Sequence, residues 1–132
     1  MKRTLGVLLL FFGALLLFTA FFTGCGKAND NSTSPNTYPK QVSVTYRVSS
    51  QSETTLNSTH YTNETGGLNQ VQNFELPFSK SVSMSVNSGD DLYLSYSDPD
   101  GPNVKLEILV DNTVVKTQTF TGNSGAIDYY FP

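Results

Sequence analysis

Residues 41–48 read Gln41-Val42-Ser43-Val44-Thr45-Tyr46-Arg47-Val48, and this stretch decides the fold. Apolar and polar side chains alternate along it without a break. Successive side chains of a strand point to opposite faces, so a period of two predicts a strand with one buried face. The same alternation recurs in residues 79–86, 91–97 and 103–110. These stretches together predict a core built between strands.

Turn residues separate these stretches from further strand-like segments. Gly, Asn, Asp, Ser and Pro cluster at residues 66–67, 87–90, 98–102 and 122–125, and Asp111-Asn112 suits a two-residue hairpin turn. The expected strands span residues 41–48, 54–62, 69–76, 79–86, 91–97, 103–110, 114–120 and 126–131. Seven or eight such strands predict an all-β fold, an antiparallel β-sandwich of immunoglobulin-like type, with a small barrel as the alternative. The polar segment at 54–62 is expected at a sheet edge.

The alternation also assigns side chains to faces. The expected inward residues are Val44, Tyr46, Val82, Met84, Leu94, Leu106 and Ile108. The expected outward residues are their neighbours Ser43, Thr45, Ser83, Ser85, Ser95, Lys105 and Glu107.

The N-terminal segment has the layout of an export signal. Lys2 and Arg3 precede an apolar run from Leu5 to Phe22, and Thr23-Gly24-Cys25 follows. This ending resembles a bacterial lipobox, which implies cleavage before Cys25 and lipidation of its thiol. We therefore expect a signal peptide at 1–24, the lipidated cysteine and a flexible spacer at 25–39, and the sandwich at 40–132. The alternative is an uncleaved helix, since a bilayer span needs about 20 apolar residues; both readings keep the domain outside the cytoplasm.

Charge and cysteine content narrow the classes of function. Losing Lys2 and Arg3 would leave 6 basic against 11 acidic residues, a net charge near −5. Mild acidity argues against binding to nucleic acid or anionic lipid headgroups. Cys25 is the only cysteine, so lipidation would leave none for a disulfide or a thiolate site.

The chain also resembles the MmpS-type transport accessory proteins. The resemblance rests on Leu76-Pro77-Phe78 with the alternating run to Tyr96, on Ile108 to Thr121, and on residues 44–48, 70–74 and 110–115. It implies a small β-sandwich on a membrane anchor that works beside RND-family lipid exporters. Members of that family have a transmembrane anchor and late cysteines, whereas this chain has the lipobox-like site.

Residues able to carry chemistry are few. His60 is the only histidine, so neither a histidine metal cluster nor a His-based triad can form, and we expect it to be solvated. Asp98-Pro99-Asp100-Gly101 has the start of a calcium loop, which Asp90 and Asp91 could complete if both turns share one end of the domain. A hairpin turn is the simpler interpretation. The sequons at Asn31, Asn57 and Asn63 are attributed to the Ser/Thr/Asn-rich composition.

The expected function is therefore non-catalytic binding or transport accessory work. Tyr61, Tyr93 and Tyr130 are the candidate contact residues, because tyrosine combines apolar area with a polar tip. No cofactor is expected; the implied partners are membrane lipid through Cys25 and an envelope protein such as an RND-type transporter. A structural surface lipoprotein without a ligand is the alternative, and an enzyme is the weakest hypothesis. Gly26 after the cysteine favours the outer over the inner membrane in a cell that has both.

The anchor chemistry can be measured directly. We expect the wild-type protein to incorporate radiolabelled palmitate in growing cells, and the Cys25→Ala variant to incorporate none, because the thiol is the attachment point. A wild-type protein that takes up no label would leave the uncleaved transmembrane helix as the anchor.

Overall fold

The computed structural model describes residues 37–101 and 103–132. The signal peptide, Cys25, Asn31 and most of the spacer lie outside these residues. Within them, no helix has the length and apolar character that crossing a membrane requires. The described chain forms eight strands: β1 (Lys40–Ser50), β2 (Thr55–Thr62), β3 (Leu68–Glu75), β4 (Phe78–Val86), β5 (Asp91–Ser97), β6 (Asn103–Val110), β7 (Thr113–Thr121) and β8 (Ser124–Tyr130). Each coincides with an expected strand to within two residues at either end.

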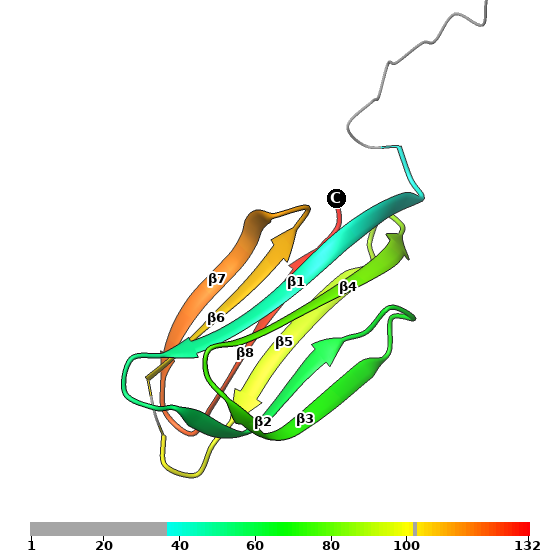
Figure 1. The fold of residues 1–132 in the computed structure, drawn as a ribbon. Coiled ribbons are helices and arrows are strands. Elements are labelled where there is room, and N and C mark those ends of the chain that lie inside the picture. The colour runs from blue at the N-terminus through cyan, green and yellow to red at the C-terminus, as the bar shows by residue number, and fades with distance from the viewer. Residues whose placement is uncertain (1–36, 102) are drawn as a thin grey trace, which may run out of the picture. The chain divides into compact units, whose positions relative to one another are not determined.

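The strands form two four-stranded antiparallel sheets. Sheet A has the order β4-β1-β6-β7 and sheet B has the order β3-β2-β5-β8. Only β2–β3 and β6–β7 are consecutive strands that pair, and the remaining connections pass from one sheet to the other (Figure 1). The prediction of an antiparallel β-sandwich is confirmed.

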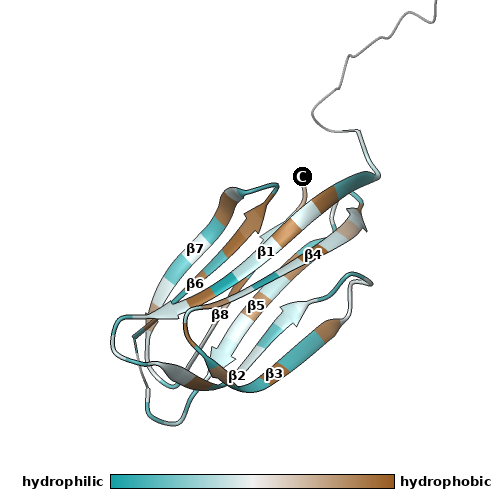
Figure 2. Ribbon diagram, in the orientation of Figure 1, coloured by the Kyte–Doolittle hydropathy of each residue, from teal (hydrophilic) through white to brown (hydrophobic). Residues whose placement is uncertain are grey.

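The core lies between the two sheets and contains residues from all of the strands except β7, which contributes partly buried Val115 and Phe120. All seven residues expected to point inward are buried, none with more than 8% of its surface exposed. Apolar and polar bands accordingly alternate along β1 (Figure 2). Thr45 and Ser95 lie on the outer faces, as their register requires, yet each is only 9% exposed. Outward direction thus does not guarantee exposure in the inner strands of a sheet.

The placement of residues 54–62 at a sheet edge was wrong. β2 is an inner strand that pairs with both β3 and β5. Its polar residues are accommodated by hydrogen bonds: the fully buried Thr59 hydroxyl donates to the Ser95 carbonyl oxygen at 2.7 Å. The polar composition of this segment suggested an edge strand. An inner strand can bury the same hydroxyl groups, because side-chain hydrogen bonds satisfy them.

The tight turn between β6 and β7 is confirmed. Asp111 and Asn112 have φ angles of 48° and 66°, the left-handed conformation that a two-residue hairpin of this type needs. Asp111 also extends the β1–β6 ladder, because its Oδ1 accepts a hydrogen bond from the Ser43 N–H at 2.9 Å. The turn thus fixes the register of the two inner strands of sheet A.

Truncating the core should destabilise the domain far more than truncating its surface. Leu106→Ala is expected to lower the free energy of unfolding by about 2–5 kcal/mol, because Leu106 is fully buried. Lys105→Ala removes an exposed partner of Glu107 at 2.7 Å and should cost less than about 0.5 kcal/mol. Denaturant titration compares the two variants, and equal losses would contradict the register of β6.

Candidate functional site

The three tyrosines expected to form a contact surface divide between the core and the surface. Tyr61 is 4% exposed, and its ring packs 5.3 Å from that of Tyr46, so its assignment as a contact residue was wrong. Tyr93 is half-buried and Tyr130 is 65% exposed. Both lie on the outer face of sheet B, since their neighbours Leu92, Leu94 and Phe131 are buried.

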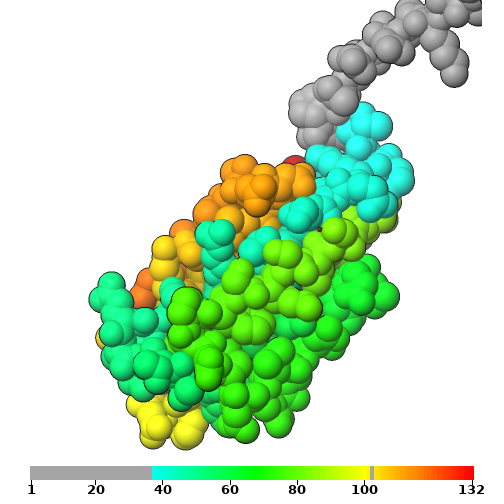
Figure 3. Space-filling model, viewed as in Figure 1, coloured from blue at the N-terminus to red at the C-terminus, as the bar shows by residue number. Residues whose placement is uncertain are grey.

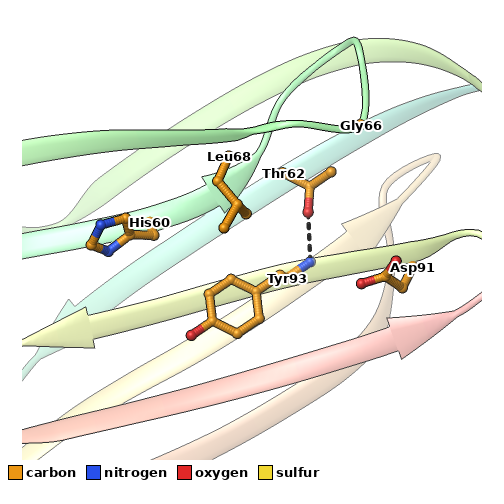
Figure 4. Close-up of a pocket in the computed structure, with 6 residues that line it drawn as sticks. All are labelled: His60, Thr62, Gly66, Leu68, Asp91 and Tyr93. Atoms are coloured by element: carbon orange, nitrogen blue, oxygen red, sulfur yellow. Dashed lines mark hydrogen bonds between the residues drawn. The ribbon is translucent and has the colours of Figure 1, made fainter.

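A groove of about 420 Å³ crosses this outer face. Its lining residues come from β2, the β2–β3 turn, β3 and β5; they are His60, Thr62, Gly66, Leu68, Asp91 and Tyr93 (Figure 4). Leu68 projects from β3 toward Tyr93, while His60 and Asp91 lie toward opposite ends of the groove (Figure 4). His60, which was expected to be solvated, is half-buried as a wall of the groove.

The outer face beside the groove extends onto β8. In the β5–β8 ladder, Asp91 is opposite Tyr130 and Tyr93 is opposite Asp128. Directly opposed side chains lie about 5 Å apart, and residues two apart on one strand lie about 7 Å apart on the same face, so both tyrosines are neighbours of both carboxylates. We call the set His60, Leu68, Asp91, Tyr93, Asp128 and Tyr130 the sheet B face. With Leu68 59% exposed, it combines accessible apolar and aromatic surface with carboxylates.

Thr62 connects β2 to β5 where the ladder between them ends. The backbone pairing stops at Tyr61 and Leu94. One residue further, the Thr62 Oγ1 accepts a hydrogen bond from the Tyr93 N–H at 2.8 Å (Figure 4). The Thr62 hydroxyl thus replaces a backbone acceptor for the Tyr93 N–H. The β2–β3 hairpin can therefore diverge from β5, which leaves the groove between them.

Asn63 organises the hairpin that borders the groove. Its Oδ1 accepts hydrogen bonds from the Thr65 N–H, the Thr65 hydroxyl and the Gly67 N–H, at 2.7–3.0 Å. Its Nδ2 donates to the Asn69 Oδ1 at 3.1 Å. Sequence reasoning treated Asn63 only as a sequon, although Asn before a Gly-containing turn is a recognised signal for such side-chain-to-backbone bonds.

The turn that resembles a calcium loop has a structural role. The Asp98 carboxylate accepts hydrogen bonds from the Asn57 N–H at 2.9 Å and the Asp100 N–H at 3.0 Å. Asp90 precedes β5 and Asp91 begins it, whereas Asp98 follows it, so the two turns lie at opposite ends of that strand. They therefore cannot share a cation, and the described residues contain no group of three or more potential ligands arranged to hold a metal.

The outer face of sheet A differs in character. β4 presents alternating serines, and the Ser81 and Thr45 hydroxyl groups are hydrogen-bonded at 2.8 Å. In Figure 3, β1 and β4 lie side by side at the surface. Its exposed large apolar residue is Val114, next to Leu109 in the β6–β7 ladder. Among the described residues, the aromatic side chain that is largely exposed is Tyr130, on sheet B, which makes the sheet B face the candidate site.

Removing the Asn63 side chain should loosen the hairpin. Asn63→Ala loses four hydrogen bonds at a partly exposed turn, and we expect a loss of about 1–2 kcal/mol in the free energy of unfolding. Asn63→Asp keeps the Oδ1 acceptor and should retain most of the stability. Asn57→Ala is the matched control, since Asn57 uses its backbone N–H to contact Asp98. Faster hydrogen exchange at Thr65 and Gly67 in Asn63→Ala alone supports this role; equal effects in both alanine variants contradict it.

No family model matches the chain, and no curated protein is significantly similar to it. The geometry of the sheet B face is therefore the basis for assigning a function.

Proposed function

We propose that this protein is a non-catalytic binding module of the cell envelope, anchored by lipid at Cys25, that binds a partner protein through the sheet B face. The observation that carries the proposal is the groove lined by Tyr93 and the exposed Leu68, beside which lies the exposed Tyr130, opposite Asp91 in the β5–β8 ladder. Exposed aromatic and apolar side chains grouped on a rigid sheet are typical of recognition surfaces.

The anchoring part of the proposal rests on the N-terminal sequence. Lys2 and Arg3, the apolar run and Thr23-Gly24-Cys25 support export followed by lipidation. The spacer of residues 26–39 is rich in Ser, Asn and Thr, and as a flexible coil it would span roughly 20 Å. We place the domain on the non-cytoplasmic side, at the outer membrane in a cell that has one. A partner could then reach the domain without contacting the bilayer.

The non-catalytic part rests on the residue types available. General acid–base or nucleophilic catalysis needs a base placed beside a nucleophile or a reacting group. His60 is the only histidine, and the Asp98 carboxylate already accepts two backbone hydrogen bonds. Tyrosine, leucine and carboxylate side chains on the sheet B face suit binding better than catalysis.

An accessory role beside an RND-type transporter is the specific form of binding that we favour. It follows from the resemblance to MmpS-type proteins in the segments around Leu76-Pro77-Phe78 and Val110 to Val115. β3 and β4, which flank Leu76-Pro77-Phe78, are edge strands of the two sheets. A large membrane partner would be consistent with a domain held near the bilayer by a short spacer.

Photo-crosslinking in intact cells tests the binding face. A photoreactive amino acid in place of Tyr130 should yield a crosslinked protein, because this side chain is 65% exposed on the sheet B face. The same amino acid in place of Thr117, exposed on β7 of sheet A, is the control and should yield none.

Mass spectrometry then identifies the crosslinked protein, and a transporter subunit would support the accessory role. Crosslinks from Thr117 but not Tyr130 would contradict the choice of face. No crosslink from either position would favour the structural surface lipoprotein.

A further inference from the structure

The charged residues of the domain are divided between its two sheets. All of the Lys and Arg residues that the structure describes lie on strands of sheet A; they are Lys40, Arg47, Lys80, Lys105 and Lys116. The strands of sheet B and the β2–β3 turn carry Glu64, Glu75, Asp91 and Asp128, and the loops that join the two sheets carry Glu53, Asp90, Asp98 and Asp100. On the sheet A side, the described acidic residues are Glu107 and the turn residue Asp111. Among the described residues, the strands of sheet A therefore carry all of the basic side chains, whereas the charged side chains on the strands of sheet B are carboxylates.

Two carboxylates of sheet B belong to the candidate site. Asp91 lines the groove, and Asp128 is opposite Tyr93 in the ladder. A second depression, of about 400 Å³, shares Gly66 and Asp91 with the groove and adds Glu64 and Asp90. The negative charge thus continues around the tip of the β2–β3 hairpin. Among the described residues, no ion pair involves the carboxylates of Asp91 or Asp128.

These features together define the chemistry of a ligand. Uncompensated carboxylates attract ammonium and guanidinium groups through charge-assisted hydrogen bonds. The ring of Tyr93 between them offers a cation–π contact. The same charges repel phosphate, so nucleic acid and anionic lipid are disfavoured on this face.

The apolar area distinguishes a protein segment from a small cation. Leu68 and Tyr130 are each more than half exposed, on the two outer strands of sheet B. Strands are spaced about 4.8 Å apart, so the face spans roughly 14 Å from β3 to β8, the length of four extended residues. A metal ion or polyamine would leave this apolar area uncovered, whereas the aliphatic stems of lysine and arginine would cover it.

We propose that the sheet B face binds a lysine- or arginine-bearing segment of the partner protein. This inference rests on the proposed binding function and specifies the chemistry of the partner. The basic side chains lie beside Asp91 and Asp128, and their stems pack on Tyr93, Leu68 and Tyr130.

Fluorescence anisotropy tests the proposal with the full chain in an uncharged detergent. The probe is a short labelled peptide in which lysine and arginine alternate with valine and threonine. We expect it to bind, and the matched peptide with glutamate in place of each base to bind at least tenfold more weakly. Asp91→Asn should weaken binding by about fivefold, as should Tyr93→Ala. Glu107→Gln removes one carboxylate from the opposite sheet and should leave binding unchanged. Raising the salt concentration should weaken binding of the basic peptide.

Other outcomes would overturn the proposal. Equal binding of the two peptides would exclude charge recognition, and an equal loss in Glu107→Gln would exclude this face. Displacement of the peptide by spermidine at equal charge concentration would indicate a polyamine site. A doubled mass in light scattering would indicate that a second copy of the chain occupies the face.

A second variant keeps the binding test decisive if the first variant misfolds. Asp128→Asn changes an exposed residue on the edge strand β8 and should weaken binding even if Asp91→Asn proves unstable. If the Tyr130 crosslink forms in cells and survives both Asn substitutions, the binding function stands and only the inference of a basic partner fails.

Discussion

The contact between Tyr46 and Tyr61 is the interaction on which the rest of the structure depends. Tyr46 projects from β1 of sheet A and Tyr61 from β2 of sheet B, and their ring centroids are 5.3 Å apart. The ring series continues through Phe78 to Phe74, at 6.3 Å and 5.1 Å. Tyr46 is completely buried, and this burial raises the pKa of its hydroxyl. Without a disulfide in the described residues, such packing between sheets is what holds the sandwich together.

This contact also determines the candidate site. Because Tyr61 points inward, its neighbours His60 and Thr62 must point outward, where they form one wall of the groove. A shift of β2 by one residue would reverse all three. Asn63 then turns the chain so that Gly66 and Leu68 return along the other wall. The core and the groove are thus two consequences of the same strand register.

The outer faces of the two sheets carry different kinds of side chain. The outer face of sheet A carries short hydroxyl side chains, such as Thr45 bonded to Ser81, and its exposed large apolar residue is Val114. The sheet B face carries aromatic, aliphatic and carboxylate groups within reach of one another. The net charge of the chain describes neither face, because it adds the basic residues on the strands of sheet A to the acidic residues on the strands of sheet B. A domain of this kind can present one face to a basic partner while the other stays inert toward it.

The sequence by itself determined the strands and turns, and the tertiary structure decided which strands are neighbours. Alternation with a period of two is a local property, so the inward positions of Val44, Leu94 and Leu106 could be read from the chain. Strand pairing depends on contacts distant in sequence, and for that reason the inner position of β2 and the burial of Tyr61 were missed. β2 also changes the face of its buried residues between Leu56 and Tyr61, opposite the positive φ of Asn73, which simple alternation cannot anticipate. The groove and the division of charge arise only when β2, β3, β5 and β8 assemble into one sheet, because that assembly alone brings Leu68, Asp91 and Tyr130 to a common face.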